Sequence, residues 1–157
     1  MIRAADARDA PWIAALWNGM IADTLFTFTT DLKTEASIIE MMDTRPVLAL
    51  EGGLGFATYG PFRSGPGYAA TVEHSILLDA RAHGLGQGRA LMAALSAQAH
   101  TAGYHIMIGA ISAENPNAIG FHKAIGFEKV GQMPQVGRKA GRWLDLILMQ
   151  KQLGPPG

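Results

Sequence analysis

Three glycines at alternating positions, between an apolar segment and a helical pattern, constrain the fold of this chain more than any other feature. Residues 68–79 are rich in β-branched and aliphatic side chains, as in a buried strand. Gly84, Gly86 and Gly88 follow, and apolar residues then return at helical spacing until Gly103. Because glycine has no Cβ, several backbone N–H groups can point into one concavity, and a helix N-terminus adds further donors. The sequence therefore predicts a strand–loop–helix unit whose loop binds an anion, most naturally a phosphate. A glycine-rich connection that binds nothing is the alternative.

The rest of the chain predicts further strands and helices around this unit. With 157 residues, 48% of them hydrophobic, the chain is long enough for one packed domain. Helices are expected after a capping Asp9, after Thr34, and from Asn115 to about Gly126. Further strands are expected at residues 2–5, 46–50, 54–62, 104–112, 127–133 and 142–153, with a frayed tail at 154–157. This order is typical of an α/β fold.

Composition and charge exclude several kinds of function. Lys and Arg (13) balance Asp and Glu (13), so nothing indicates a nucleic-acid or membrane partner. The absence of cysteine excludes disulfides, thiolate metal sites and a cysteine nucleophile, and it fits a reducing cytoplasm. The charged N-terminal segment and the lack of a membrane-length apolar run predict neither a signal peptide nor a membrane span. The histidines are scattered without ligand spacing, so we expect no metal site.

Two common phosphate-binding motifs do not fit the glycine loop. A P-loop ends in Gly-Lys-Ser/Thr, whereas this loop continues from Gly88 into Arg89 and Ala90. A dinucleotide-binding fingerprint requires a third glycine three places after its second, and those places hold Arg89 or Leu91. Neither motif therefore describes the loop.

The order of the elements resembles that of the GNAT acetyltransferase superfamily. The pyrophosphate loop of that family reads Arg or Gln, x, x, Gly, x, Gly or Ala, and His83-x-x-Gly86-x-Gly88 matches it best, with His83 as a departure. A second frame, Arg81-x-x-Gly84-x-Gly86, keeps the arginine. The family's downstream pattern, Asn-x-x-Ala-x-x-Leu-Tyr leading to Gly-Phe, is matched by Asn115, Ala118, Phe121, His122, Gly126 and Phe127. The resemblance implies a single acetyltransferase domain over residues 1–153, with a mixed central sheet flanked by helices.

Within the superfamily, the chain is most similar to the phosphinothricin and methionine sulfoximine N-acetyltransferases. Segments 16–28, 71–88, 107–127 and 136–150 carry this similarity. It implies transfer of an acetyl group from acetyl-CoA to the amine of a small amino acid analogue, such as methionine sulfoximine, methionine sulfone or phosphinothricin. It also implies a homodimer. Acetylation of another amine and a non-catalytic acyl-CoA-binding module are the alternatives.

The resemblance also implies which residues hold acetyl-CoA. The strand residues just before the loop are expected to present backbone amides to the pantetheine arm. Asn115 either binds that arm or only caps its own helix. The complete expected set is Ile76, Leu77, Leu78, His83, Gly84, Leu85, Gly86, Gln87, Gly88, Arg89 and Asn115.

Acetyl transfer to an amine needs proton carriers, and two residues fit this need. The ammonium must lose a proton before its nitrogen attacks, and an acid helps the departing thiolate. Glu73 lies in an apolar strand, where a lone carboxylate is costly, and is expected to be the base. A solvent-facing edge-strand residue, or one paired with Arg63, is the alternative. His122 is expected from the resemblance to assist the thiolate or to hold a water that does, and a buried structural histidine is the alternative. His74 alternates to the other face of the strand and is expected to be structural.

The amine-binding side is less well defined in the sequence. The residues expected there are Trp17, Thr24, Phe28, Glu73 and Trp143. Apolar residues on helices and strands are otherwise core by default. A basic cluster near the C-terminus, formed by Arg138, Lys139 and Arg142, could bind a substrate carboxylate, a phosphate of coenzyme A, or only water.

Overall fold

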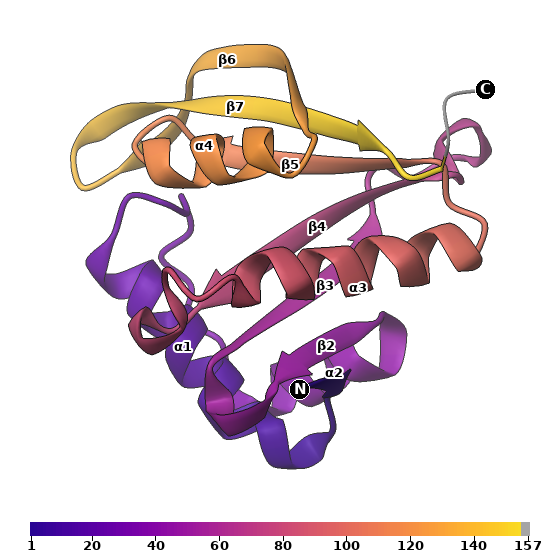
Figure 1. Ribbon diagram of the computed structural model, residues 1–157. Coiled ribbons are helices and arrows are strands. Elements are labelled where there is room, and N and C mark those ends of the chain that lie inside the picture. Colours follow the sequence, from indigo (N-terminus) through magenta and orange to yellow (C-terminus); the bar gives the residue numbers. More distant parts are fainter. Residues whose placement is uncertain (155–157) are drawn as a thin grey trace.

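A mixed sheet with helices on both faces organises the chain (Figure 1). The computed structural model describes residues 1–154. The strands are β1 (Ile2–Ala4), β2 (Val47–Leu50), β3 (Gly55–Pro61), β4 (Thr71–Leu78), β5 (Ile106–Ser112), β6 (Glu128–Lys139) and β7 (Arg142–Gln152). The α-helices are α1 (Ala10–Asp23), α2 (Glu35–Thr44), α3 (Gln87–Thr101) and α4 (Pro116–Ala124). The strands lie in the order β1-β2-β3-β4-β5-β7-β6, and all neighbours are antiparallel except β4 and β5. The predicted α/β class is confirmed.

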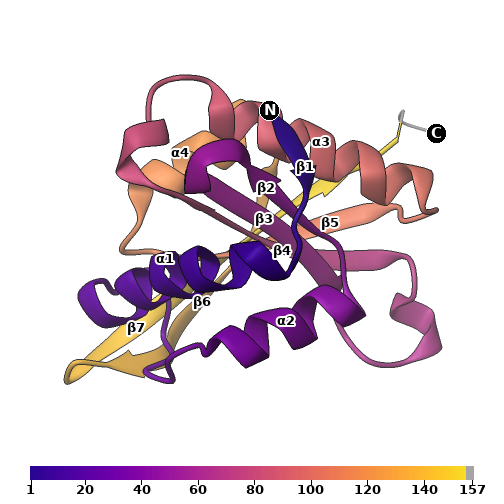
Figure 2. The ribbon, with the colours of Figure 1, turned by 90° about the horizontal axis from the view of Figure 1, so that it is seen from below.

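Two apolar clusters divide the helices into two layers. On one face, Ile13 of α1 and Ile38 of α2 pack with Phe56 of β3. On the other face, Leu95 of α3 and Phe121 of α4 pack with the opposite side chains of the strands. Figure 2 looks onto α1 and α2, which cover the first face. The sheet is therefore buried on both sides, which explains the long apolar runs in its central strands.

The alternation of β4 decides which side chains meet which helix layer. Leu77 packs in the cluster of α1 and α2, so Glu73, four residues earlier, points toward the same layer. Ile76 packs in the cluster of α3 and α4, so His74 points toward that layer. The side chains of Glu73 and His74, which are neighbours on β4, therefore lie on opposite faces of the sheet.

The parallel pair of β4 and β5 opens partway along its length. Pairing runs only from Thr71 with Ile106 to His74 with Gly109. Beyond that point β4 continues to pair with β3 as far as Leu78, and β5 continues to pair with β7. The two strands therefore diverge, and each leaves one edge of its backbone without a neighbouring strand in the gap.

Two of the predicted helix starts are confirmed by their capping bonds. The Oγ1 of Thr34 accepts a hydrogen bond from the Ser37 N–H at 3.1 Å at the start of α2. The Oδ1 of Asn115 accepts one from the Ala118 N–H at 3.2 Å at the start of α4.

Asp9 directly precedes α1 as predicted, but its side chain makes no capping bond because the carboxylate has other partners. Arg3 donates two hydrogen bonds to its carboxylate, at 2.7 and 2.8 Å, and the Trp12 indole donates a third at 2.9 Å. These bonds replace a cap on α1. The Arg3 guanidinium holds the pKa of the Asp9 carboxyl well below its usual range, so this buried group stays ionised.

The strand predicted at 127–133 continues further than the sequence indicated. β6 runs to Lys139 along β7, with a register shift between Met133 and Gly137. Pro134, which has no N–H to donate, and Gln135, at φ 57°, lie inside this irregularity. The proline explains why the sequence pattern suggested an earlier end.

The C-terminal end of the chain was expected to be frayed over residues 154–157. Residues 155–157 lie outside the described residues. Gly154 lies against the His100 ring, whose Cε1 would be 2.8 Å from an added Cβ. None of the helices within residues 1–154 combines the length and apolarity needed to cross a bilayer.

Candidate active site

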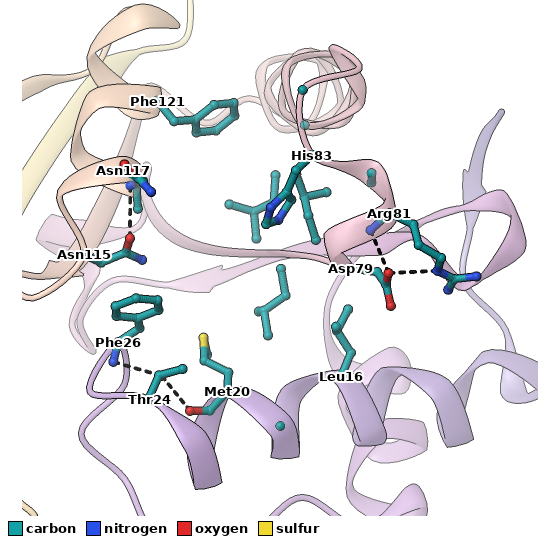
Figure 3. A pocket seen from close by; sticks show the side chains of 18 of the residues that line it. Leu16, Met20, Thr24, Phe26, Asp79, Arg81, His83, Asn115, Asn117 and Phe121 are labelled. Atoms are coloured by element: carbon teal, nitrogen blue, oxygen red, sulfur yellow. Dashed lines mark hydrogen bonds and ion pairs between the residues drawn. The ribbon is translucent and has the colours of Figure 1, made fainter.

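A pocket of about 1140 Å³ lies beside the gap between β4 and β5 (Figure 3). Leu16 and Met20 of α1 lie on one side of it, and Asn117 and Phe121 of α4 lie on the other. The end of β4 and the glycine loop close the remaining wall. The lining residues are Trp12, Ala15, Leu16, Gly19, Met20, Asp23, Thr24, Phe26, Gly53, Ile76, Leu77, Leu78, Asp79, Arg81, Ala82, His83, Gly84, Gly86, Gly88, Arg89, Asn115, Asn117, Ala118, Phe121 and His122.

The glycine loop has the backbone that an anion cradle requires. Gly84 and Gly86 have φ values of 78° and 75°, in the left-handed region that favours glycine. Gly86 precedes the first turn of α3 and supplies no side-chain cap, so the N-terminal N–H groups of the helix point outward with their dipole. A Cβ at Gly88 would lie 2.9 Å from Leu78 Cδ1. Gly88 therefore packs tightly against β4, and all three loop glycines line the pocket.

The side chains around the loop favour one of the two motif frames. Arg81 and His83 both line the pocket, but the Nε of Arg81 donates to the Asp79 carboxylate at 2.8 Å, whereas the His83 ring points into the pocket (Figure 3). Arg89 also lines it. The side chain of Leu85 is exposed outside the pocket lining, so in the cradle this residue can offer only its backbone.

Gln87, the residue between the last two glycines, has a buried Oε1 without a hydrogen-bond partner. Like Leu85, it is not part of the pocket lining. Its expected place in the cradle therefore also depends on the backbone.

The end of β4 brings the three predicted pantetheine residues to the pocket. Ile76, Leu77 and Leu78 all line it, at the edge of β4 that β5 has left. Asn115 faces them from the start of α4. Alternate backbone groups of this edge are therefore placed to hydrogen-bond an extended ligand, as a further strand would.

Glu73 lies beside the point where β4 and β5 separate. Its strand is the fourth of the sheet, which excludes an edge-strand position, and the Arg63 guanidinium lies over the Tyr68 ring instead. Burial raises the pKa of the Glu73 carboxyl above its ordinary value. The side chain is half-buried on the α1 and α2 side and is not part of the pocket lining itself.

His122 contacts a histidine that the sequence did not connect with it. Its Nε2 lies 2.9 Å from the Nε2 of His74, and both side chains are buried. The Nδ1 of His122 is 2.7 Å from the Ala118 carbonyl, and the Nδ1 of His74 is 2.9 Å from the Ile108 carbonyl. The pair lies where β4 and β5 separate, on the side opposite Glu73. Within residues 1–154, no three potential metal ligands of the His, Asp or Glu type lie together.

Comparison with known proteins agrees with this architecture. Residues 47–148 match the model of the acetyltransferase (GNAT) domain. The chain belongs to the GNAT acetyltransferase family. It is 39% identical to an L-methionine sulfoximine/L-methionine sulfone acetyltransferase of Pseudomonas aeruginosa, over 98% of this chain and 95% of that protein.

Two solved GNAT structures are close to this one. An acetyltransferase of Salmonella typhimurium with its cofactor acetyl-CoA superposes with a TM-score of 0.93 at 34% identity, covering 100% of this chain and 95% of that one. A phosphinothricin acetyltransferase of Sinorhizobium meliloti in complex with acetyl-CoA has a TM-score of 0.90 at 32% identity, covering 98% and 88%.

The residues predicted for the amine-binding side of this GNAT protein are only partly brought together. Thr24 lines the pocket, where its hydroxyl donates to the Met20 carbonyl at 2.7 Å. Trp17 packs on Phe56 and Phe28 lies against Gly137, and neither side chain lines the pocket. Trp143 is 59% exposed and lies outside the pocket lining.

Several residues that line the pocket were missed by sequence reasoning. On α1, Leu16 and Met20 are four residues apart and share one helix face, and Thr24 follows directly after the end of the helix. On α4, Asn117 and Phe121 are related by the same interval. Helical spacing counted from Thr24 would have identified the first two.

The basic cluster of this GNAT protein bonds to the protein itself. The Nζ of Lys139 donates to the carbonyls of Ile21, Thr24 and Thr27, at 2.8, 2.9 and 2.8 Å. Arg142 forms an ion pair with Glu114 at 2.7 Å, and Arg138 lies over the Trp143 ring at 4.4 Å. None of the three basic residues lines the pocket.

Proposed function

We propose that this GNAT protein transfers the acetyl group of acetyl-CoA to the amine of a small amino acid analogue of the methionine sulfoximine, methionine sulfone or phosphinothricin type. The observation that carries the proposal is the glycine cradle at the open end of the β4–β5 gap, next to a large pocket. Similarity over nearly the whole chain to a methionine sulfoximine and sulfone acetyltransferase supports the substrate class. The proposed acetyltransferase domain spans residues 1–153.

In this proposal, coenzyme A binds along β4 and across the loop. The pyrophosphate lies on the amides of residues 84–89, where Arg89 and His83 add side-chain donors. The pantetheine arm runs along Ile76–Leu78, whose free edge offers hydrogen bonds. Asn115 uses its Oδ1 to cap α4 and donates from Nδ2 to the arm.

The proposed proton chemistry uses both sides of the β4–β5 junction. Glu73 takes a proton from the substrate ammonium, and its raised pKa makes the carboxylate a better base near neutral pH. The free amine then attacks the thioester carbon, and the C–S bond breaks with its electron pair leaving on sulfur. His122 lies in the pocket wall and assists the departing thiolate.

The proposed amine side fits a short, largely apolar side chain. Leu16, Met20 and Phe26 present apolar surface next to Thr24. Such a wall suits the methylene groups of a methionine analogue, and polar groups at the gap meet its amine. Trp17 and Phe28 are proposed to hold this wall in place rather than to contact the substrate.

A homodimer and a cytoplasmic location complete the proposal. The edge strand β6 and its neighbour β7 expose apolar side chains that a second copy would cover, namely Val130, Met133, Val136 and Trp143. Trp143 would approach a substrate only in such an assembly. Sedimentation of the purified chain should give the dimer mass, and a monomer at all concentrations would contradict it. The cysteine-free composition suits the cytoplasm, and cell fractionation would test the location.

A steady-state assay of thiol release from acetyl-CoA tests the function. We expect kcat/KM for methionine sulfoximine and methionine sulfone to exceed that for methionine by at least about 10-fold, since a site built around the extra oxygens discriminates against analogues that lack them. Equal or faster turnover of lysine or aminoglycosides would contradict the substrate class. Binding of coenzyme A by calorimetry without thiol release from any amine would favour a non-catalytic module.

A further inference from the structure

The buried contact between His74 and His122 limits how many protons the two imidazole rings can carry, and the proposed function makes no use of this limit. Each Nδ1 faces a carbonyl oxygen, Ile108 for His74 and Ala118 for His122. A carbonyl only accepts, so both Nδ1 atoms must carry a proton. Two neutral rings would then bring two bare Nε2 lone pairs to 2.9 Å from each other. The contact becomes a hydrogen bond only if one Nε2 also carries a proton.

A hydrogen bond between the two rings therefore requires three ring protons and one positive charge on the pair. Burial lowers the pKa of both rings, and the neighbouring His122 charge contributes to lowering that of His74 to about 3. Two charges are thus excluded, and His74, whose pKa is lowered to about 3, is the ring that stays neutral. The pKa of His122 is lowered by burial as well, so its hydrogen bonds to His74 and to the Ala118 carbonyl must offset the cost of burying the charge. His122 takes the extra proton, with the Ala118 carbonyl and the bare His74 Nε2 as its two acceptors.

The surroundings hold both rings in this arrangement. The groups packed around the pair are aromatic rings and carbonyls: the Phe127 centroid lies 5.2 Å from each imidazole, and Phe121 lies 5.2 Å from His122. Within residues 1–154, no carboxylate or ammonium contacts either ring. Across from His74 on β5 is Gly109, where a Cβ would approach His74 Cε1 to 3.0 Å. The missing side chain gives the His74 ring its space.

We propose that His74 is a positioning residue whose neutral Nε2 accepts a hydrogen bond from His122 and keeps His122 positively charged at the thioester end of the pocket. This inference rests on the proposed acetyltransferase function. Both ring nitrogens of His122 are engaged, so His122 acts through its charge. As the tetrahedral intermediate collapses, the C–S bond breaks and its electron pair leaves on sulfur beside the imidazolium. The attacking nitrogen gives one proton to Glu73 before attack and the second to sulfur as the amide forms, so the histidine pair ends unchanged.

Two substitutions separate this role from a merely structural one. His74→Phe keeps an aromatic ring beside Phe127 and removes the acceptor. His74→Gln places an amide oxygen near the Nε2 position and keeps an acceptor. We expect His74→Phe to lower kcat about 10²-fold with little change in KM for acetyl-CoA, and His74→Gln to recover most of that loss. A structural role predicts the reverse order, since phenylalanine suits an apolar site better than glutamine.

The dependence of kcat on pH distinguishes the proposed role from a structural one, because a loss of packing alone would not shift it. The active form of His122 is protonated, so kcat falls as the pH rises through its pKa. Without the acceptor that pKa drops, and the fall moves to lower pH in His74→Phe but not in His74→Gln. The exposed His105 provides matched controls, because His105→Phe and His105→Gln should leave kcat and the profile unchanged. Identical profiles for His74→Phe and the parent would overturn the proposal.

Ring ¹⁵N spectra of the histidine-labelled full chain test the proton count without any turnover. Near neutral pH we expect one doubly protonated ring and one ring protonated only at Nδ1. Two neutral rings, or a stoichiometric metal ion bound between the Nε2 atoms, would overturn the proposal. If the parent acetylates no amine, the acetyltransferase function fails, while these spectra still decide whether the pair carries the charge.

Discussion

Lys139 is expected to hold the amine side of the pocket in place, and its removal is a sharp test of the structure. Its ammonium donates to three carbonyls, at the end of α1 and in the segment that follows. One of these belongs to Thr24, and the same segment carries Phe26 of the pocket wall. Replacement by methionine keeps an unbranched stem of similar length and removes only the three donors.

The magnitude follows from the number and kind of bonds lost. A hydrogen bond to a charged group contributes about 1.5–3 kcal/mol net. The three bonds share one ammonium that is partly accessible to water, and such contributions do not add fully. We therefore expect Lys139→Met to lower the free energy of unfolding by about 2–4 kcal/mol. A cation at the C-terminal end of α1 also favours the helix dipole, which acts in the same direction.

Urea unfolding and steady-state kinetics measure the two consequences. Besides the loss of stability, KM for the amine should rise, because the loosened segment forms one wall of its pocket. KM for acetyl-CoA should stay near the parent value, because the glycine cradle is built from other elements. Arg138→Met is the matched control: it removes the neighbouring charge, whose contact with Trp143 is exposed and contributes about 0.5–1 kcal/mol. Equal stability and equal amine KM in the two variants would refute the reasoning.

Two further predictions concern the cradle and the base. Gly88→Val should weaken coenzyme A binding, measured by calorimetry on a variant shown to be folded, because the first added carbon already lies 2.9 Å from Leu78; unchanged affinity would remove the loop from the site. Glu73→Gln should lower kcat by about 10²–10⁴-fold, with partial recovery at higher pH, where more substrate arrives deprotonated. In the parent, activity should fall toward acid pH earlier than for an exposed carboxylate, since burial raises the pKa of Glu73 and the base must be ionised. A Glu73→Gln enzyme with the parent's turnover and pH profile would show that Glu73 is not the base.

Much of the fold could be predicted because local patterns and global packing agree. The caps at Thr34 and Asn115 and the glycine positions were visible as residue types at characteristic places. Asp9 was misassigned because its partner Arg3 is on a different element, and capping preference describes only neighbours in sequence. The end of β6 was misplaced because Pro134 interrupts a ladder that resumes beyond it. The extension of β6 is a contact that only the assembled sheet creates, whereas Arg3 and Asp9 are only six residues apart.

The amine side shows the same limit in another form. Trp17, Phe28 and Trp143 were chosen for residue type, and the structure places none of them in the pocket lining. For the basic cluster the sequence allowed a substrate carboxylate, a phosphate of coenzyme A or only water, whereas Lys139 donates to carbonyls that are 112 to 118 residues away in sequence. Lys139 donates to carbonyls at the end of a helix and in the following loop that have no backbone N–H partner in the described part of the chain. Such a lysine cannot be recognised from the sequence, because every residue has a backbone carbonyl.

His74 shows what the pattern contained and what it lacked. Strand alternation correctly placed it on the face opposite Glu73, and the same alternation put it on the face of Ile76, a residue expected to hold coenzyme A. The same alternation therefore predicts that His74 lies on the face of the sheet where coenzyme A is expected to bind. The sequence could not identify its partner, because His122 is 48 residues away. Their 2.9 Å contact depends on how α4 crosses the end of the β4–β5 pairing. A buried histidine is commonly satisfied by the core, and here both rings are satisfied at Nδ1 by carbonyls. With both Nδ1 atoms so engaged, the two Nε2 atoms can form a hydrogen bond only if they share a single proton, and this is why our proposal places one charge at the junction of the two strands.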